Sequence, residues 1–321
     1  MSNLDIELGI KTNDGRALAP LIEEKLIWET ERKDSPGRLT FKCLFDEKNI
    51  FEEGDLITIK YRGSPVFYGF IFSISRDKDK ILSVIAYDQL RYLKNKDVYE
   101  YRDKKASDVV KMLATDFKLN LGEIEDTKFI IPKRLEDNVT LFDIIQTALG
   151  ITLQNLKQMY VLYDDFGKLT LKNVETMKLD LVIDENVSEN FSYKSSIERS
   201  ANQIKIMKDD AQSGKRVPYV WPDAKSIEKW GILQYVTKLE EKENMKVKAD
   251  ALLKLYNRKF KSLSIKNISG NILVRAGTSV IVDMDLGDIK IKNYMLVEKA
   301  KHVFEKDYYY MDLTLRGADI Q

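Results

Sequence analysis

The sequence predicts a mainly β protein of the α+β class. It should contain two similar small β-barrel domains, with an α+β insert between them and a helical excursion in the second. Two observations lead to this prediction. Runs rich in β-branched and aromatic residues, bounded by Gly, Pro and Asp, occur in the same order near both ends of the chain. Between these two sets, the hydrophobic period changes from two residues to that of a helix.

The repeated set of runs has the pattern of a three-stranded meander preceded by one more strand. The six meander strands are expected at 54–61, 66–74, 81–87, 277–284, 294–303 and 308–316. The run 39–42 begins fifteen residues before Gly54, and the run 263–266 begins fourteen before Gly277. Spacing kept over four elements favours an internal duplication over the alternative of two unrelated meanders.

The first barrel is expected at residues 1–101. Apolar residues alternate over 4–10 and end at Asn13-Asp14-Gly15, which is a hairpin signal. The segments 25–31 and 39–45 read as strands on either side of an exposed loop. A closed or nearly closed barrel would bury these strands without leaving a long open edge.

The insert is expected at residues 102–189. Apolar residues at helical spacing predict a helix over 106–117, with Ser107 as its N-cap. A second helix should begin at Thr140, which opens a capping-box-like sequence, and should end at Gly150. The segments 159–163 and 168–172 flank a turn-rich sequence and predict a hairpin.

The second barrel is expected at residues 190–321. Strand-like runs at 203–208 and 216–221, joined by a turn at 209–214, resemble the first strands of the chain in their order. The helical excursion should span about 222–261, because an apolar stripe at helical spacing runs from Met245 to Phe260.

Composition limits the possible functions. The 52 Lys and Arg residues nearly balance the 51 Asp and Glu residues, and no run of like charges marks a nucleic-acid or membrane tail. The single Cys43 lies in a strand-like run and should be a small buried hydrophobe. The N-terminus has no signal-peptide pattern and no apolar run is long enough to span a membrane, so the protein should be made in the cytoplasm.

No catalytic, cofactor or metal site is expected. The single His302 lies in an alternating strand, where a solvent-facing or interface position is expected. The pairs Asp164-Asp165 and Asp209-Asp210 lie in predicted turns. The acids at 283, 285 and 288 faintly resemble a calcium loop but lack its remaining ligands.

Aromatic residues in the strand 66–74 raise the possibility of a stacking surface. Tyr68, Phe70 and Phe72 should share one face, while Phe67 and Ile71 take the other. Barrels of the OB type bind single-stranded nucleic acid through aromatics combined with a positive groove, and the sequence shows no basic half for such a groove. A core face and a subunit-contact face are therefore expected.

Several motifs together resemble the baseplate hub proteins of contractile phage tails, in particular the hub-type proteins of defective phage-like elements in Gram-positive bacteria. In chain order the motifs are Phe70-Ile71, AYDQLRYLKNK (86–96), TLFDIIQ (140–146), MYVLYDDFGKLTL (159–171), KWGILQ (229–234), ADALLKLY (249–256) and MDLTLRG (311–317). The resemblance covers nearly the whole chain and rests on the order of the motifs.

The resemblance implies a structural protein, not an enzyme, that binds no cofactor. It implies a homotrimer in which two tube-type barrels per chain form a pseudo-six-fold ring between the six-fold tail tube and the three-fold spike. The implied partners are the tail tube protein, the central spike protein and other baseplate components, with neither specific nucleic acid nor membrane insertion. Two alternatives stay open: a tail-associated peptidoglycan-degrading enzyme, which needs a pair of carboxylates, and an OB-type single-strand binder.

Two turn loops are the candidate subunit contacts, at 32–37 and 75–80. The candidate residues in these loops are Lys33, Asp34, Ser35, Pro36, Arg76, Asp77 and Lys78.

Overall fold

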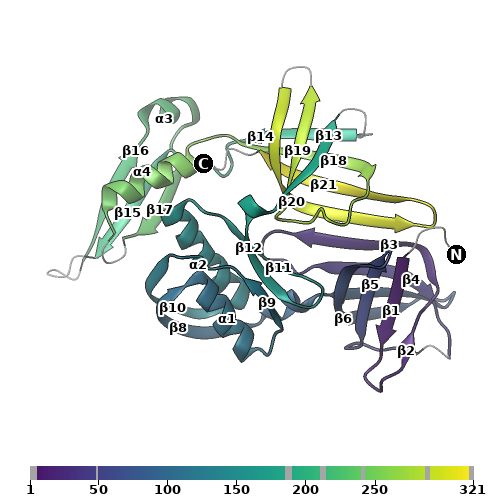
Figure 1. Cartoon of the computed structure of the whole chain (residues 1–321). Helices are drawn as coiled ribbons and strands as arrows, with labels where there is room; N and C mark the ends of the chain where they lie inside the picture. The colour runs from purple at the N-terminus through teal and green to yellow at the C-terminus, as the bar shows by residue number, and fades with distance from the viewer. Residues whose placement is uncertain are drawn as a thin grey trace.

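A computed structural model describes residues 6–47, 50–184, 190–209, 215–239, 243–285 and 290–317. The mainly β class is confirmed, since a 13-stranded sheet and three small sheets make up most of the fold. In Figure 1 the large sheet fills the right side, α1 and α2 lie at the lower left, and a small sheet with α3 and α4 lies at the upper left.

The large sheet has two halves. The first half contains β1 (Ile6–Lys11), β2 (Ala17–Leu18), β3 (Ile22–Glu31), β4 (Arg38–Leu44), β5 (Leu56–Tyr61), β6 (Ser64–Arg76) and β7 (Ile81–Tyr87). The second contains β13 (Lys178–Asp184), β14 (Asn190–Ser196), β18 (Phe260–Ser269), β19 (Ser279–Asp285), β20 (Lys290–Glu305) and β21 (Tyr309–Gly317).

The same strand order occurs in both halves. The first half runs β4-β7-β6-β5 and the second runs β18-β21-β20-β19, with every pair antiparallel. In addition, β3 flanks β4 as β14 flanks β18. The internal repeat seen in the sequence is therefore also a repeat of hydrogen-bond order.

The edges of the two halves differ. β1 pairs antiparallel to β5, whereas β13 pairs parallel to β19. The halves join where β20 pairs with β3, so one sheet runs through both, and no closed barrel is found in the described parts of the chain.

Strands β15 (Gln203–Asp209) and β16 (Arg216–Pro222) do not take the places of β1 and β2, so that part of the predicted repeat is wrong. They form a separate sheet with β17 (Gln234–Lys238), which pairs parallel to β15. Helix α4 (Met245–Tyr256) packs its buried Ala249 and Leu252 against this sheet. The excursion thus includes a sheet as well as α3 (Ala224–Trp230) and α4; most of the predicted turn at 209–214 lies outside the described residues.

The insert follows β7 through a short 3-10 helix. Its elements are η1 (Gln89–Lys94), β8 (Lys96–Lys105), α1 (Ala106–Asp116), β9 (Leu121–Ile124), β10 (Ile130–Thr140), α2 (Leu141–Leu156), β11 (Tyr160–Asp164), β12 (Leu169–Asn173) and η2 (Val174–Thr176). The next strand, β13, lies within the range predicted for the insert but pairs with β19 of the large sheet. The domain boundaries themselves stay a prediction.

The two predicted helices of the insert are present, with corrected ends. Ser107 is not the N-cap of α1; it is buried two residues after the N-cap, Lys105, and its backbone N–H donates to Thr127 Oγ1. Thr140 caps α2 as predicted, since its Oγ1 accepts from Asp143 N at 3.1 Å. Helix α2 continues through Gly150 to Leu156, so the predicted stop there is wrong.

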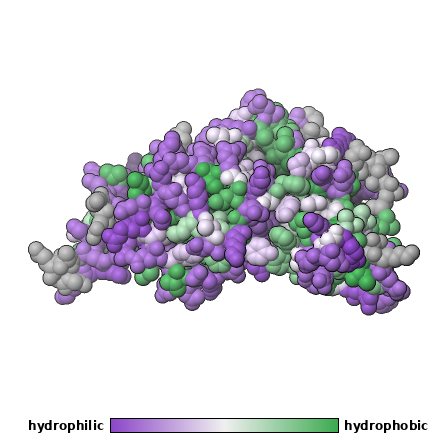
Figure 2. All heavy atoms as spheres, turned by 60° about the horizontal axis from the view of Figure 1, so that its bottom comes forward, coloured by the Kyte–Doolittle hydropathy of each residue, from purple (hydrophilic) through white to green (hydrophobic). Residues whose placement is uncertain are grey.

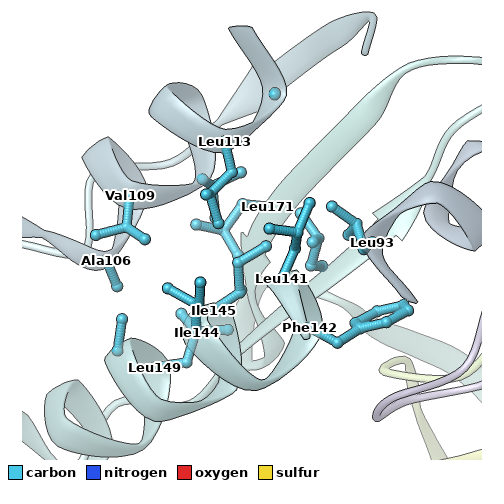
Figure 3. Close-up of a cluster of buried hydrophobic side chains, with 14 of the residues drawn as sticks. Leu93, Ala106, Val109, Leu113, Leu141, Phe142, Ile144, Ile145, Leu149 and Leu171 are labelled. Atoms are coloured by element: carbon cyan, nitrogen blue, oxygen red, sulfur yellow. The ribbon is translucent and has the colours of Figure 1, made fainter. Parts of the chain in front are cut away.

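The apolar faces of α1 and α2 meet in the core of the insert, where side chains of both helices point toward one another (Figure 3). Val109, Leu113, Leu141 and Ile144 are all buried completely there. Burial of each such side chain stabilises the fold by roughly 1.5–3 kcal/mol. Because the buried positions recur at the spacing of a helix, the helical period is visible in the sequence.

The aromatic strand β6 has the two predicted faces, but the outer one is covered by the chain itself. Phe67 and Ile71 are buried in the core of the first half. On the other face, Tyr68 packs on Phe166 with ring centroids 5.7 Å apart, and Phe70 packs on Tyr92 at 6.1 Å. An intramolecular contact with the insert therefore accounts for this face. Cys43 is buried, as predicted.

Candidate interaction surface

The junction between the two sheet halves contains the only histidine of the sequence. His302 on β20 faces Trp28 on β3 in the strand ladder, and the two rings stack with centroids 4.6 Å apart. The side chain is completely buried, so the predicted solvent-facing or interface position is wrong. Strand β20 pairs with a strand on each edge, and residues pack against the face that carries His302. The alternation of residues along the strand does not reveal this packing.

Burial keeps the ring of His302 neutral, and its two contacts set the tautomer. The Val274 carbonyl can only accept, so Nε2–H of His302 donates to it at 2.9 Å. Nδ1 then accepts from the Tyr309 hydroxyl, also at 2.9 Å. Burial lowers the pKa of His302 to about 3. The residue therefore acts as a fixed hydrogen-bonding bridge in the junction and not as a proton carrier near neutral pH.

An ion cluster lies at the β3 end of the same junction. Arg32 binds Glu298 in a two-pronged geometry, with Nε–Oε2 at 2.9 Å and Nη2–Oε1 at 3.0 Å. Arg316 reaches Glu298 Oε1 at 3.3 Å. Burial by itself would raise the pKa of Glu298, but the two guanidinium groups outweigh it and the pKa is lowered. Glu298 is thus an anion held by two cations.

A second buried network ties the insert to both halves. Asp88 accepts from the backbone N–H of Gly37 in the β3–β4 loop and from that of Leu90 at the start of η1. Asp164 accepts from Gln89 Nε2 at 2.8 Å, and from the N–H of Gly167, as expected for a turn residue. Burial raises the pKa of both carboxyl groups.

Arg275 connects this network to the second half. Its Nη2 donates to the Asp164 carbonyl at 2.7 Å, and its guanidinium lies over the Tyr163 ring, 4.0 Å from the centroid. Burial lowers the pKa of Arg275. Because Asp88 and Asp164 are 4% and 6% exposed, they hold the chain segments together and offer no open carboxylate pair to a substrate.

Two glycines let the β11–β12 hairpin approach both halves of the sheet. Gly167 has a φ of +84°, and a Cβ there would lie 2.7 Å from the Tyr68 ring of β6. Gly277 has a φ of +99°, and a Cβ there would lie 2.7 Å from a methyl group of Val161 on β11. Both positions combine a left-handed backbone with contact too close for any other residue.

The two predicted contact loops lie at opposite ends of the first half. In the β4–β7 ladder, Arg38 pairs with Tyr87 beside the first loop, and Leu44 pairs with Ile81 beside the second. Strands of this length separate their ends by about 20 Å. The structure therefore does not bring the two loops together in one chain.

The residues of the first loop differ in exposure. Lys33 and Asp34 are exposed, Ser35 is half-buried and Pro36 is buried. Lys94 Nζ donates to the carbonyl of Asp34 at 3.1 Å, which ties the loop to η1. Lys33 and Asp34 are thus the parts of this loop that another molecule could reach.

The second loop is exposed throughout. Arg76, Asp77 and Lys78 are all solvent-exposed, and Asp77 Oδ1 accepts from the N–H groups of Asp79 and Ile81 to fix the turn. Both loops stay predictions as subunit contacts.

The first loop borders a groove of about 620 Å³ in which basic side chains from distant segments meet. Besides the loop, the groove is lined by Arg199, Lys261, Glu298 and Arg316. Only the loop was recognised from the sequence; the other residues lie one by one on β18, β20, β21 and the turn after β14, with no local motif to connect them.

Figure 2 shows hydrophilic residues over most of the face that it presents, with hydrophobic residues in separate small patches. Within the described residues, no helix is both long and apolar enough to cross a membrane. That same part of the chain has no group of three or more His, Cys, Asp or Glu side chains that could hold a metal ion. Asp283 and Asp285 instead form ion pairs with Lys292 and Lys290; residue 288 of the weak calcium motif and the predicted turn at 286–288 lie outside the described residues.

This architecture is the fold of phage tail proteins. The 43 kDa tail protein of prophage MuSo2 from Shewanella oneidensis matches with a TM-score of 0.69 at 13% identity, over 98% of this chain and 99% of that one. The E. coli protein c3393 matches with a TM-score of 0.56 at 10% identity, over 98% of this chain and 78% of its own; it is described as a type VI secretion component structurally similar to the T4 tail proteins gp27 and gp5.

The chain belongs to the YQBQ-like family, whose pattern matches residues 26–316. It is 26% identical to YqbQ of Bacillus subtilis (strain 168) over 303 residues, 92% of each protein. It is also 26% identical over 257 residues to XkdQ of the phage-like element PBSX in the same organism, covering 79% of this chain and 78% of XkdQ. The resemblance to tail hub proteins of phage-like elements is thereby confirmed.

Proposed function

We propose that the protein is the structural hub of a phage-like contractile tail baseplate. In this proposal three chains form a ring, and each chain contributes two tube-type barrel modules, so that the ring offers six similar positions. The observation that carries the proposal is the strand order that occurs twice in one chain, β4-β7-β6-β5 and β18-β21-β20-β19.

The duplication matches the symmetry that the proposed ring requires. A cyclic trimer of single modules presents three equivalent sites, whereas a trimer of doubled modules presents six quasi-equivalent ones. One rim of such a ring can bind a six-fold tail tube, and the other can bind a three-fold spike. The proposed partners are therefore further copies of this chain, the tail tube protein, the spike protein and other baseplate components.

The positions of the two loops support contacts from head to tail. Subunits in a ring use two different surfaces on opposite sides of each subunit. The loops 32–37 and 75–80 lie at opposite ends of the β4–β7 ladder and so meet that requirement. We assign Lys33, Asp34, Ser35 and Pro36 to one contact and Arg76, Asp77 and Lys78 to the other.

The alternative of a peptidoglycan-degrading enzyme draws little support from the site. A glycosidase needs two carboxyl groups on either side of an open groove. The buried pair with raised pKa values, Asp88 and Asp164, is held by backbone and side-chain donors and is almost inaccessible.

The protein is proposed to be made in the bacterial cytoplasm and to act after assembly into the baseplate.

The oligomeric state tests the proposal. The mass of the purified chain is measured by light scattering, alone and mixed with the spike protein of the same element. A mass of three chains in either condition is expected, and electron microscopy of that species should show a ring with six similar lobes. A chain that stays monomeric in both conditions, or a trimer without six lobes, would contradict the proposed function.

A further inference from the structure

A single cleft concentrates positive charge in a nearly neutral chain. The groove of about 620 Å³ beside loop 32–35 adjoins a smaller hollow of about 140 Å³, and the two share Lys33, Phe260 and Arg316. We call the two together the basic cleft. Ten Lys and Arg residues line it against four Asp and Glu residues, whereas the whole sequence has 52 against 51.

Most of the acids in the basic cleft are already neutralised by its own cations. Glu298 is bound by Arg32 and Arg316, as described above. Glu198 pairs with Lys194 at 3.0 Å, and Glu31 pairs with Lys299 at 2.9 Å.

In the larger groove, three cations remain for another partner. Among the residues that the structure describes, Lys33, Arg199 and Lys261 form no ion pair. All three residues are exposed. They come from the β3–β4 loop, the turn after β14 and the start of β18, and they converge on one groove.

Gathering these cations costs electrostatic free energy. Loss of hydration lowers the pKa of Lys33, and the neighbouring Arg32 lowers it further. Burial also lowers the pKa of Arg316, to which Arg32, Arg258 and Arg199 add repulsion. An anion entering the basic cleft would relieve this repulsion, and that gain would favour binding.

We infer that the basic cleft binds an acidic segment of a partner protein, through carboxylates that pair with Lys33, Arg199 and Lys261. The inference takes from the proposed function only that the partner is a tail component; the chemistry of the partner rests on the cleft itself. The groove volume suits a few side chains of a peptide segment.

The aromatic residues of the basic cleft favour a protein over a nucleic acid. Single strands bind by stacking their bases on free aromatic faces. Here Tyr256 is stacked on Tyr235 with centroids 4.8 Å apart, and Arg258 lies over Phe260 at 5.5 Å. Both rings therefore already have partners, so the aromatic residues that line the cleft are engaged within the chain.

A binding experiment with defined probes tests the inference. The full chain is titrated into a fluorescein-labelled hexaglutamate peptide, and into a labelled dT12 oligonucleotide, with anisotropy read at 50 and 300 mM NaCl. We expect the peptide to bind at low salt and to bind at least tenfold more weakly at high salt. The triple variant Lys33→Gln, Arg199→Gln, Lys261→Gln should lose at least tenfold in affinity. A control with Lys96→Gln, Lys111→Gln and Lys118→Gln, all exposed lysines outside the cleft and the contact loops, should bind within twofold of the natural chain.

Two results would overturn the inference: hexaglutamate that fails to bind at 50 mM NaCl, or equal losses in the triple and control variants. Tighter binding of dT12 with the same dependence on the three residues would assign the cleft to nucleic acid instead. The mass measurement, alone and with the spike protein, is made in parallel on the same preparations. A natural chain that binds the peptide but never trimerises would refute the proposed hub function and leave the inferred binding by the cleft intact. A trimer that does not bind the peptide would refute the inference and leave the proposed hub function intact.

Discussion

At the scale of single residues, burial decides the charge state of His302 in the junction. His302 is neutral because burial lowers its pKa, which outweighs the opposite effect of its hydrogen bond to the Val274 carbonyl. This burial is not visible in the sequence, because an alternating strand has the same pattern whether its second face meets solvent or a neighbouring sheet. Cys43 was predictable because the apolar residues around it leave only one interpretation.

His302 makes stability depend on pH in a definite direction. Its pKa is about 3 in the folded chain and about 6.5 when unfolded. Between these values the unfolded chain binds the extra proton, so the free energy of unfolding falls as pH falls, by up to about 1.4 kcal/mol per pH unit from this residue. The stabilising contribution is complete above pH 6.5 and is lost toward pH 3. Urea unfolding at several pH values from 7.5 to 4.5 measures it.

His302→Gln is the matched variant, because an amide can keep one donor and one acceptor but does not titrate. The difference in unfolding free energy between the natural chain and this variant should shrink as pH falls. Asp88 and Asp164, whose pKa values are raised, contribute a pH dependence of opposite sign, and the comparison removes it because both proteins carry them. Equal slopes in the two proteins would show that His302 is not the source.

At the scale of elements, periodicity located the helices and strands better than it located their ends and partners. Helix α2 was found from its stripe and its Thr140 cap, but Gly150 did not stop it, because Ile151 and Thr152 continue to pack on the insert. Strands β15 and β16 were also found. Their assignment to the large sheet was wrong, because the residue pattern of a strand does not show which sheet the strand joins.

Replacement of glycine by alanine is expected to stabilise the chain at one position and to destabilise it at two others. Gly150→Ala should raise the free energy of unfolding by about 0.5–1 kcal/mol, because the site is helical and a Cβ there meets nothing within 4 Å. Gly277→Ala and Gly167→Ala should each lower it by at least about 2 kcal/mol, through the left-handed backbone and the clash with Val161 or Tyr68. Thermal unfolding followed by circular dichroism ranks the three, and a stable Gly277→Ala would refute the close approach.

At the scale of the whole molecule, the repeat was visible in the sequence because both copies keep the same strand spacing. The joining of the halves through β20 and β3 was not visible, nor were the ion cluster at Glu298 and the network around Asp88. Arg32 and Glu298 are 266 positions apart, and no local pattern links residues at that distance. The candidate loops were accessible to sequence reasoning only because turn chemistry is local.

Charge reversal tests the two loops as contacts in the proposed ring. Lys33→Glu and Lys78→Glu should each raise the dissociation constant of the trimer by roughly tenfold or more, because a contact surface selected for one charge repels the other. Lys111→Glu, at an exposed position of helix α1, is the control and should leave the mass distribution unchanged. Sedimentation at several protein concentrations measures all three, and intact assembly of both loop variants would remove the loops from the interface.

Strand β20 belongs to both copies of the repeat, since it pairs with β19, β21 and β3. Its ladder with β3 contains seven residue pairs, from Lys299–Glu31 to Glu305–Lys25. A pull along these strands would load all seven pairs at once, in shear, instead of peeling them apart one by one. The doubled protein thus lacks the compliant hinge that two tethered modules would have, and a displacement imposed on one copy is passed to the other through the backbone.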